Sequence, residues 1–434
     1  MAHNGEDRQL PLTSITPLLK RLWPSPAKTN VSADEIALAI SHIFTNQLSP
    51  VQTGALLTAL HFTGWDRRSD IIAKCAEVMR SAATPVDTEA LRDVIRRRGR
   101  REGSYKGGFC DIVGTGGDDH STFNVSTTAS ILASSLLLVS KHGNRASTSL
   151  SGSADILAYL DPAPRLHLVT SETITKVVEE TNYAFLFAPM FHPSMKYVAA
   201  VRKELGWRTI FNLLGPLSNP LDAVVEARIV GVARADLGPV FAEALRMGGA
   251  KKAMVVCGEE DLDEISCAGR TFCWRLVERP NPDYRGSSTT EDDNAESSDD
   301  DAPAPTLVDI QHFVLSPSDF GLPSHPLSEV ASGKLPDENA AVLDAILRDT
   351  LGDQSPVLDF VLMNTAALFV VAGVCDAEAS DMGPPDDGNV IEETGPGQGR
   401  WKEGVRRARW AMQSLKALRS WEDFVRVSRS FEKT

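Results

Sequence analysis

Glycines and hydroxyl side chains that could bind a phosphate group are concentrated between residues 114 and 127. The segment GTGGD at 114–118, which we call the glycine turn, follows a short apolar run and precedes TFNVST at 122–127. Glycines let the backbone approach an anion closely, and the N–H groups and dipole of a following helix favour negative charge. The pattern matches neither the P-loop nor the GxGxxG motif. A tight turn followed by an ordinary helix cap is therefore the alternative.

A second polar cluster, KHGNR, occupies residues 141–145 and is predicted to follow a strand at 136–139. Lys141, His142 and Asn144 supply a cation, an imidazole and an amide at the carboxyl end of that strand, where α/β proteins usually bind ligands. The cluster leads into a second turn of small residues, SGSAD at 151–155. A surface lysine or a core histidine would explain any one of these residues, but the combination favours a binding site.

Adjacent acids at positions 263 and 264 follow a predicted strand. In isolation such a pair is typical of a solvated loop. Opposite a phosphate site, Asp263 and Glu264 would supply the hard oxygen ligands that Mg²⁺ takes together with substrate phosphates.

His192 and Arg202 lie just before and on an amphipathic helix predicted at 193–205. A guanidinium can bind a carboxylate through two parallel hydrogen bonds, which makes Arg202 a candidate for recognising an acidic substrate. A surface histidine and an exposed arginine are the simpler alternatives.

Short helices are predicted at 31–83, within an N-terminal helical domain covering residues 1–91. Ser32 and Glu35 can form a capping box, and Gln52 is placed to close a second one for a helix that begins at Pro50. Gly64 is a typical C-terminal stop, and a third amphipathic run covers 71–79. Residues 92–108 are rich in arginine and are predicted to form a solvated basic connector.

The remainder of the chain, 109–434, is predicted to be an α/β domain. Helical stretches separate most of its short apolar runs, which lie at 110–113, 136–139, 184–187, 225–232 and 253–257. Such alternation favours a mostly parallel central sheet flanked by helices. The predicted fold class is therefore α/β, with a small N-terminal helical domain. A final helical region at 400–431 is predicted to pack onto the sheet through one apolar face.

The formal net charge of −14 belongs to two segments rather than to the whole surface. Residues 283–301 contain eight acids and one arginine, and residues 376–399 contain seven acids and no base. The segments at about 279–306 and 376–400 are rich in proline, glycine, serine and acids, so both are predicted to be disordered insertions. The rest of the chain is formally neutral, which gives no support to a basic nucleic-acid-binding face.

Cysteine spacing and hydropathy suggest a cytoplasmic protein without membrane contact. The six cysteines form no CxxC pair and no zinc-type pattern with histidine, so buried thiols in a reducing compartment are predicted. No apolar run is long enough to cross a bilayer, and the first ten residues, MAHNGEDRQL, lack the pattern of a signal peptide.

The order GTGGD, TFNVST, KHGNR, SGSAD resembles the anthranilate phosphoribosyltransferases of tryptophan biosynthesis. Other segments are similar to that family as well: SPVQTGALLTAL at 49–60, FAPMFHPSMKYVAAVRKELG at 187–206, RTIFNLLGPLSNP at 208–220 and DLDEIS at 261–266. The resemblance covers nearly the whole chain except the acidic insertions and the basic connector. It implies transfer of the 5-phosphoribosyl group from phosphoribosyl pyrophosphate (PRPP) to the amino group of anthranilate, with release of pyrophosphate.

Matching motif positions imply roles for individual residues. The residues implied to hold PRPP are Gly114, Gly117, Asp118, Thr122, Asn124, Ser126, Thr127, Lys141 and Ser153. The metal, expected to be two Mg²⁺ ions with Glu264 touching both, would be bound through Ser126, Asp263 and Glu264. Anthranilate would lie near Gly114, His142, Asn144, His192, Arg202 and Pro216. His142 and Arg202 are the residues expected to act in catalysis, with Arg202 paired to the anthranilate carboxylate.

Three positions depart from the family pattern. One residue is missing between Thr127 and Lys141, which would re-aim the KHGNR segment slightly. Leu150 stands where the family often has lysine, and Ala158 replaces a common glutamate. None of these changes removes a residue of the implied site.

The implied reaction places negative charge on departing pyrophosphate and oxocarbenium character on the ribose carbon. An aromatic amine is already neutral near pH 7, so no obligatory base is expected, and His142 either accepts the proton late or positions the amine. Pyrimidine nucleoside phosphorylases share the fold but need no paired acids like those in DLDEIS, and nucleic-acid-binding paralogues would need a basic face. The resemblance also implies a homodimer formed through the helical domain, which residues 190–212 would join in space, and a hinge between the domains.

Overall fold

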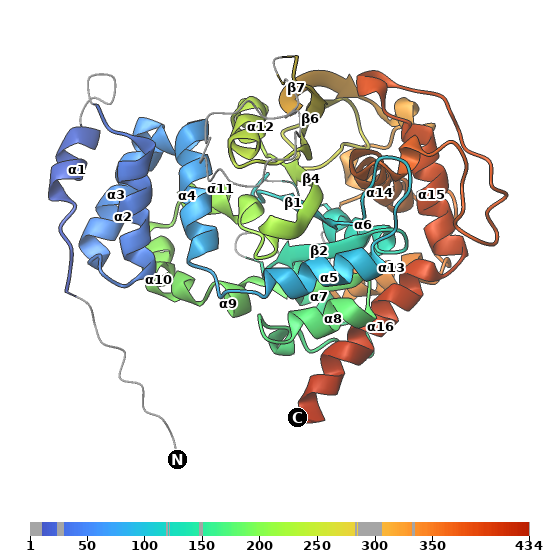
Figure 1. Ribbon diagram of the computed structural model, residues 1–434, viewed down its shortest axis with the longest axis horizontal. Helices are drawn as coiled ribbons and strands as arrows, with labels where there is room; N and C mark the ends of the chain where they lie inside the picture. The colour runs from blue at the N-terminus through green and yellow to red at the C-terminus, as the bar shows by residue number, and fades with distance from the viewer. Residues whose placement is uncertain are drawn as a thin grey trace, which may run out of the picture.

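The computed structural model describes residues 11–23, 30–118, 120, 122–146, 151–282, 284, 306–331 and 335–433. A small all-helical unit lies beside a larger α/β domain (Figure 1). The helical unit begins with α1 (Thr16–Leu22), α2 (Ala33–Phe44), α3 (Pro50–Thr63) and α4 (Ser69–Ser81). Two later helices, α10 (Lys196–Leu205) and α11 (Ile210–Leu214), pack against α3, and α11 also packs against α4. The helical unit is thus built from two separate parts of the chain.

Capping residues define the ends of these helices. The Ser32 hydroxyl accepts from the Glu35 N–H at 3.2 Å and the Glu35 carboxylate accepts from the Ser32 N–H at 3.0 Å, which confirms the predicted capping box. Gly64 ends α3 with φ +76°, also as predicted. The prediction for Gln52 is wrong: its Oε1 accepts from the Ile15 N–H at 2.7 Å, so the side chain links α3 to the start of α1 instead of closing a box.

The prediction of a basic connector at 92–108 is wrong over its first half, because residues 88–98 form helix α5 (Thr88–Arg98). Leu91 and Val94 are fully buried in the core of the α/β domain, and α5 packs against α8 (Ile174–Glu180). Arg98 donates hydrogen bonds to the carbonyl oxygens of Val178 and Thr181. The arginines suggested a solvated linker, but the apolar pair three residues apart gives the helix a buried face.

A seven-stranded sheet forms the centre of the α/β domain, in the order β3-β2-β1-β4-β5-β6-β7. The strands are β1 (Phe109–Gly114), β2 (Leu138–Gly143), β3 (Tyr183–Phe187), β4 (Val225–Gly231), β5 (Lys252–Gly258), β6 (Thr271–Pro280) and β7 (Thr306–Leu315). The first five are parallel, which confirms the predicted fold class, and β6 and β7 add an antiparallel hairpin.

The hairpin corrects the prediction of disorder at 279–306. Its ladder continues to the pairs Arg279–Leu307 and Pro280–Thr306, so both ends of that segment are strand. Most of the predicted insertion, 285–305, lies outside the described residues. The sequence prediction missed both strands because it treated the polar residues between them as the end of regular structure.

Helices cover both faces of the sheet (Figure 1). Side chains alternate along β4, so that Ala227 and Ile229 join one core with α14 (Pro356–Ala372), whereas Val230 joins the other with α12 (Leu237–Met247). The remaining α-helices of the described residues are α6 (Val125–Ala133), α7 (Ser153–Ala158), α9 (Ala188–Phe191), α13 (Pro336–Leu347), α15 (Trp401–Gln413) and α16 (Lys416–Ser430). All six cysteines are buried free thiols, as predicted. No helix among the described residues has the length and apolarity needed to cross a bilayer.

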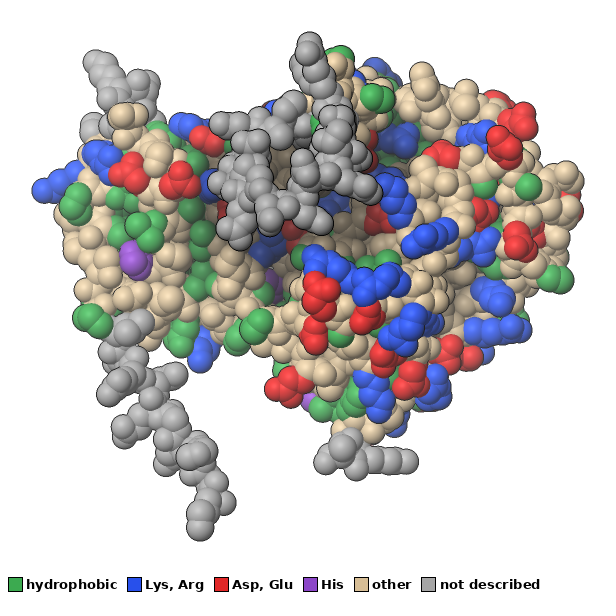
Figure 2. All heavy atoms as spheres, viewed as in Figure 1, with side chains coloured by type: hydrophobic (Ala, Val, Ile, Leu, Met, Phe, Trp, Pro, Cys, Tyr) green, Lys and Arg blue, Asp and Glu red, His purple; other side chains and the backbone are tan. Residues whose placement is uncertain are grey.

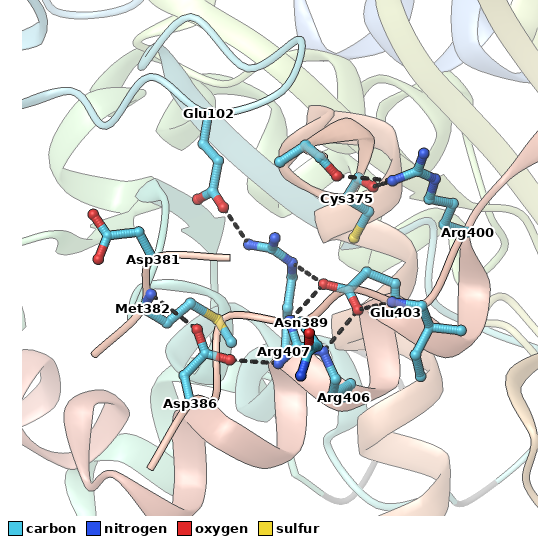
Figure 3. A network of polar contacts seen from close by, with 12 residues as sticks. Glu102, Cys375, Asp381, Met382, Asp386, Asn389, Arg400, Glu403, Arg406 and Arg407 are labelled. Carbon is cyan, nitrogen blue, oxygen red and sulfur yellow. Dashed lines mark hydrogen bonds and ion pairs between the residues drawn. The ribbon is translucent and has the colours of Figure 1, made fainter. Parts of the chain in front are cut away.

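Residues 376–400 have defined positions, which contradicts their predicted disorder. Polar contacts within the segment and with α15 hold it in place (Figure 3). Asp386 accepts from Arg406 on α15 at 2.6 Å, the Gly383 carbonyl accepts from the Trp410 indole at 2.8 Å, and Arg400 donates to the Ala377 carbonyl at 2.8 Å. Hydrogen bonds from fixed side chains, together with the buried Met382, therefore order a segment that has few large apolar residues.

A buried ion network lies under this segment (Figure 3). Glu403 and Arg407 are one helical turn apart on α15, both fully buried, and are joined by a 2.7 Å hydrogen bond. Arg407 also pairs with Glu102 at 2.9 Å, and Glu403 pairs with Arg406 at 2.7 Å. The network thus connects α15 to the chain just before β1.

We expect Glu403→Ala to lower the free energy of unfolding by about 3–5 kcal/mol, because it leaves the buried Arg407 charge with one partner fewer. Urea denaturation would measure the change. Asp423→Ala, which removes an exposed partner of Arg426, is the matched control and should cost under about 1 kcal/mol. Equal losses in the two variants would contradict a stabilising role for the buried network.

Candidate active site

The glycine turn lies against Asp263 at the carboxyl ends of β1 and β4. The Gly116 N–H donates to Asp263 Oδ2 at 2.5 Å. A Cβ atom added at Gly114 would stand 2.5 Å from that same oxygen, and one added at Gly231 would stand 1.5 Å from the Asp263 carbonyl oxygen. The lack of side chains at the ends of two adjacent strands therefore allows the acidic segment to lie directly against the glycine turn.

Glu264 faces the start of α6, beside Asp263. Its Oε1 accepts from the Ser126 N–H at 3.3 Å, and its Oε2 is buried without a hydrogen-bond partner among the described residues. Burial raises the pKa of Glu264 well above its usual range, and the neighbouring Asp263 and Asp118 raise it further. Burial, followed by repulsion from Asp118, raises the pKa of Asp263 to about 7. The structure thus holds two adjacent, partly buried acids whose negative charges a cation would neutralise.

These residues fit Mg²⁺ bound together with a phosphate-bearing ligand. The donor set of Asp263, Glu264 and Ser126 consists of hard oxygens, and Glu264 Oε2 has an open acceptor site. Across the described part of the chain, no three His, Cys, Asp or Glu side chains converge on a metal-binding point. Oxygens from a substrate would therefore have to complete the coordination, as is usual for Mg²⁺.

Lys141 brings a buried positive charge to the same edge of the sheet. The residue lies within β2, which corrects the prediction that KHGNR follows the strand, because β2 continues to Gly143. Lys141 Nζ donates to the Ile112 carbonyl at 2.6 Å and lies 3.4 Å from Ser126 Oγ. Burial lowers its pKa, whereas Asp111 acts in the opposite direction. The ammonium group therefore stands between β1 and the start of α6.

The other residues implied to hold PRPP surround this edge. Asn124 binds the second turn, since its amide donates to the Ser151 carbonyl at 3.1 Å and its Oδ1 accepts from the Ser151 hydroxyl at 3.2 Å. Ser153 begins α7 next to Gly143, where an added Cβ would contact the serine Cβ at 3.3 Å. Thr127 is buried on α6 and its hydroxyl has no partner among the described residues.

The last residue implied to hold PRPP, Thr122, and the two substituted positions 150 and 158 lie outside this group of contacts or outside the described residues. Thr122 forms an isolated bridge with Ala331. Ala158 is exposed at the end of α7, and Leu150 lies outside the described residues.

A pair of histidines lies beyond Lys141, with ring centroids 5.2 Å apart. His192 Nε2 donates to the Ser218 carbonyl at 2.9 Å. His142 donates to the Gly215 carbonyl, and its Nε2 is buried without a partner among the described residues. Burial, together with His192, lowers the pKa of His142 to about 3. A neutral His142 with an open acceptor nitrogen is suited to receive a hydrogen bond from a substrate N–H.

Arg202 contacts two residues of α11. Its Nη2 donates to Asn212 Oδ1 at 3.2 Å, and its guanidinium lies 5.8 Å from the centre of the Phe211 ring. Burial lowers the Arg202 pKa, but the guanidinium stays charged at any physiological pH. No contact in the described residues joins Arg202 directly to the two histidines. They are linked indirectly, because Arg202 contacts α11 and His142 contacts Gly215 at its C-terminal end.

The two remaining acceptor-side residues flank the histidines. Pro216 is buried next to Gly215, in the short turn that follows α11. Asn144 is exposed just beyond β2, and its Oδ1 accepts from the following Arg145 N–H at 2.8 Å.

Arg208 was not singled out from the sequence, yet it contacts the glycine turn. Its guanidinium donates to the carbonyl oxygens of Gly116 and, at 3.3 Å, Thr115. A Cβ added at Gly117 would stand 1.6 Å from Arg208 Nη1. One sequence feature could have indicated Arg208: it immediately precedes Thr209, the N-cap residue of α11, so its backbone is held by the helix start.

Known proteins are similar to this chain in both sequence and fold. Family models of a glycosyl transferase match it in two parts, the helical bundle domain at residues 16–83 and the a/b domain at 106–283 and 302–418. The anthranilate phosphoribosyltransferase of Schizosaccharomyces pombe is 39% identical over 391 residues, covering 90% of this chain and 91% of that protein. The chain belongs to the anthranilate phosphoribosyltransferase family. This membership confirms the resemblance inferred from the motifs.

Solved structures of the family superpose over most of the chain. The Saccharomyces cerevisiae enzyme in complex with PRPP and Mg matches with a TM-score of 0.73 and 31% identity, covering 95% of this chain and 97% of that one. The same yeast enzyme in complex with 4-fluoroanthranilate matches with a TM-score of 0.70 and 29% identity, covering 95% and 96% of the two chains.

The raised pKa of Asp263 leads to a prediction about metal-free protein. Its folded value of about 7 exceeds the ordinary 3.8, so ionisation destabilises the fold increasingly as pH rises from about 4 to 7. Asp263→Asn should therefore raise the free energy of unfolding at pH 8 more than at pH 5, as measured by urea denaturation in EDTA. Asp353→Asn, at an exposed position, is the control and should show no such pH dependence. A pH-independent effect of Asp263→Asn would contradict the raised pKa.

Proposed function

We propose that this chain transfers the 5-phosphoribosyl group of PRPP to the amino group of anthranilate, giving N-(5-phosphoribosyl)anthranilate and pyrophosphate in tryptophan biosynthesis. The observation that carries the proposal is the contact between Asp263 and the glycine turn, which brings the acidic pair to the phosphate-binding edge of the sheet. Family membership supplies the chemical context. The yeast relatives were solved with PRPP and Mg and with an anthranilate analogue, which supports the same substrate pair for this chain.

The donor half of the site consists of the glycine turn, the start of α6, Lys141 and Ser153. Backbone N–H groups and hydroxyls in this half would bind the phosphate oxygens, and the buried Lys141 ammonium adds positive charge beside them. Asp263, Glu264 and Ser126 would hold Mg²⁺, proposed as two ions with Glu264 touching both. When bound, Mg²⁺ stabilises negative charge on the leaving pyrophosphate.

The acceptor half consists of His142, Asn144, His192, Arg202 and Pro216. Arg202 would bind the anthranilate carboxylate through its guanidinium. His142 Nε2 would accept a hydrogen bond from the amine and aim its lone pair at the ribose carbon. With a pKa near 3, His142 is too weak a base to keep the released proton, so the geometry favours positioning over base catalysis. Orientation of two substrates can contribute about 7–11 kcal/mol to catalysis.

Loss of anthranilate fluorescence during incubation with PRPP and Mg²⁺ would test the proposed reaction. We expect the wild-type chain to consume anthranilate only when both additions are present. Glu264→Ala should lower turnover at least a hundredfold across a Mg²⁺ titration while anthranilate binding changes little, because this carboxylate is proposed to touch both ions. Near-normal turnover by a chain lacking both carboxylates of the acidic pair would overturn the metal assignment.

We also propose that the chain is a homodimer formed through the helical unit. Leu38, Val51 and Phe62 on α2 and α3 are 59–81% exposed, and apolar side chains are visible on the helical unit in Figure 2. Sedimentation velocity should give twice the chain mass, and Val51→Asp should shift the species toward monomer. A monomer at micromolar wild-type concentration would contradict the dimer.

A cytoplasmic location stays a prediction supported by the six free thiols, and cell fractionation would test it.

A further inference from the structure

Among the described residues, Arg208 is the side chain that holds the outer side of the glycine turn. Because a peptide group is planar and trans, its N–H and C=O point in opposite directions. The peptide between Thr115 and Gly116 is bound at both ends, since its N–H donates to Asp263 and its C=O accepts from Arg208. The C=O of the next peptide, that of Gly116, accepts from the same guanidinium, so the Gly117 N–H must point away from Arg208.

Thr115 is also held by hydrogen bonds with Gly231 and Ala233, but within the described residues no other hydrogen bond restrains Gly116 and Gly117 from the outer side. Gly116 and Gly117 have φ values of +65° and +70°, a backbone region that glycine enters freely and leaves as easily. A Cβ added at Gly116 would meet no atom within 4 Å. The turn borders a cavity of about 360 Å³ that is also lined by Arg208 and by Arg67 of the helical unit. Without the guanidinium, the two carbonyls would face this cavity and the peptides could rotate.

Arg208 is itself fixed by the acceptor half of the site. It immediately precedes Thr209, whose N–H donates to Asn212 Oδ1 at 3.0 Å at the start of α11. The same oxygen accepts from Arg202 at 3.2 Å. Asn212 therefore anchors both the proposed carboxylate-binding arginine and the backbone from which Arg208 reaches the turn.

We propose that Arg208 is a positioning residue for the donor substrate, holding the glycine turn so that the Gly117 N–H faces the diphosphate of PRPP. The inference rests on the proposed function for the identity of the anion. It assigns to Arg208 no contact with the reacting atoms. Its role is to remove the conformational freedom that the two glycines give to the turn, and Asn212 links that role to the acceptor half.

Steady-state kinetics of Arg208→Ala would test this role. We expect the KM for PRPP to rise about tenfold or more, as for the loss of a charge-assisted hydrogen bond, while the KM for anthranilate stays within about twofold. Arg208→Lys keeps the charge but loses the rigid fork that spans both carbonyls, so it should fall between wild type and Arg208→Ala. Arg202→Ala should show the reverse pattern, with a raised KM for anthranilate. Hydrogen exchange of the peptide covering 114–118 should be faster in Arg208→Ala than in wild type.

Arg234→Ala is the matched control, because Arg234 lines the same cavity but pairs with Asp236 at 2.9 Å through two hydrogen bonds. An equal rise in the KM for PRPP in this variant would overturn the proposal in favour of a general effect of cavity charge. Unchanged exchange at 114–118 in Arg208→Ala would overturn it as well. If wild type shows no transferase activity, the proposed function fails, whereas hydrogen exchange and calorimetric PRPP binding still decide the role of Arg208.

Discussion

The close approach of Asp263 to the ends of β1 and β4 is the constraint on which the rest of the site depends. Any side chain at Gly114 or Gly231 would occupy space that the aspartate already fills. Parallel strands β1 and β4 are neighbours in the sheet, so their ends open at the same edge. With both ends free of side chains, an acidic segment that follows β5 can close over the turn that follows β1. The proposed metal ligands and the proposed phosphate-binding groups meet for this reason.

Charge at this edge is concentrated where burial makes it costly. Glu264 and Asp263 are held near Asp118, and Lys141 is buried close by. Isolated buried charges are unfavourable unless they are paired or bind a metal. Adjacent acids at this edge, with the Glu264 Oε2 atom lacking a partner among the described residues, would consequently be stabilised by a cation and its anionic partner. The electrostatics of the site thus favour the binding of the proposed ligands together.

The sequence predicted the five parallel strands and the caps of the first helices because local patterns decide both. Contacts between distant residues decided what it missed. Helix α5 depends on burial of Leu91 and Val94 against the larger domain, and residues 376–400 are ordered by Arg406 and Trp410 from the helix that follows. Motif similarity named most candidate site residues, but Arg208 acts through backbone carbonyls, which carry no signature in the sequence. Composition likewise could not show that the polar residues of 376–400 would form hydrogen bonds with side chains of α15.

The two halves of the site rest on different cores, and this division bears on how substrates would be brought together. The donor half stands on the ends of the strands, whereas Arg202 and Arg208 come from a segment that packs with the helical unit. The contact of Arg208 with the glycine turn joins the halves, whereas the contacts of His142 with Gly215 and of His192 with Ser218 lie on the acceptor side. A shift of the helical unit would therefore move the acceptor groups and the support of the turn at once. The geometry of both substrates depends on one interface rather than on two independent pockets.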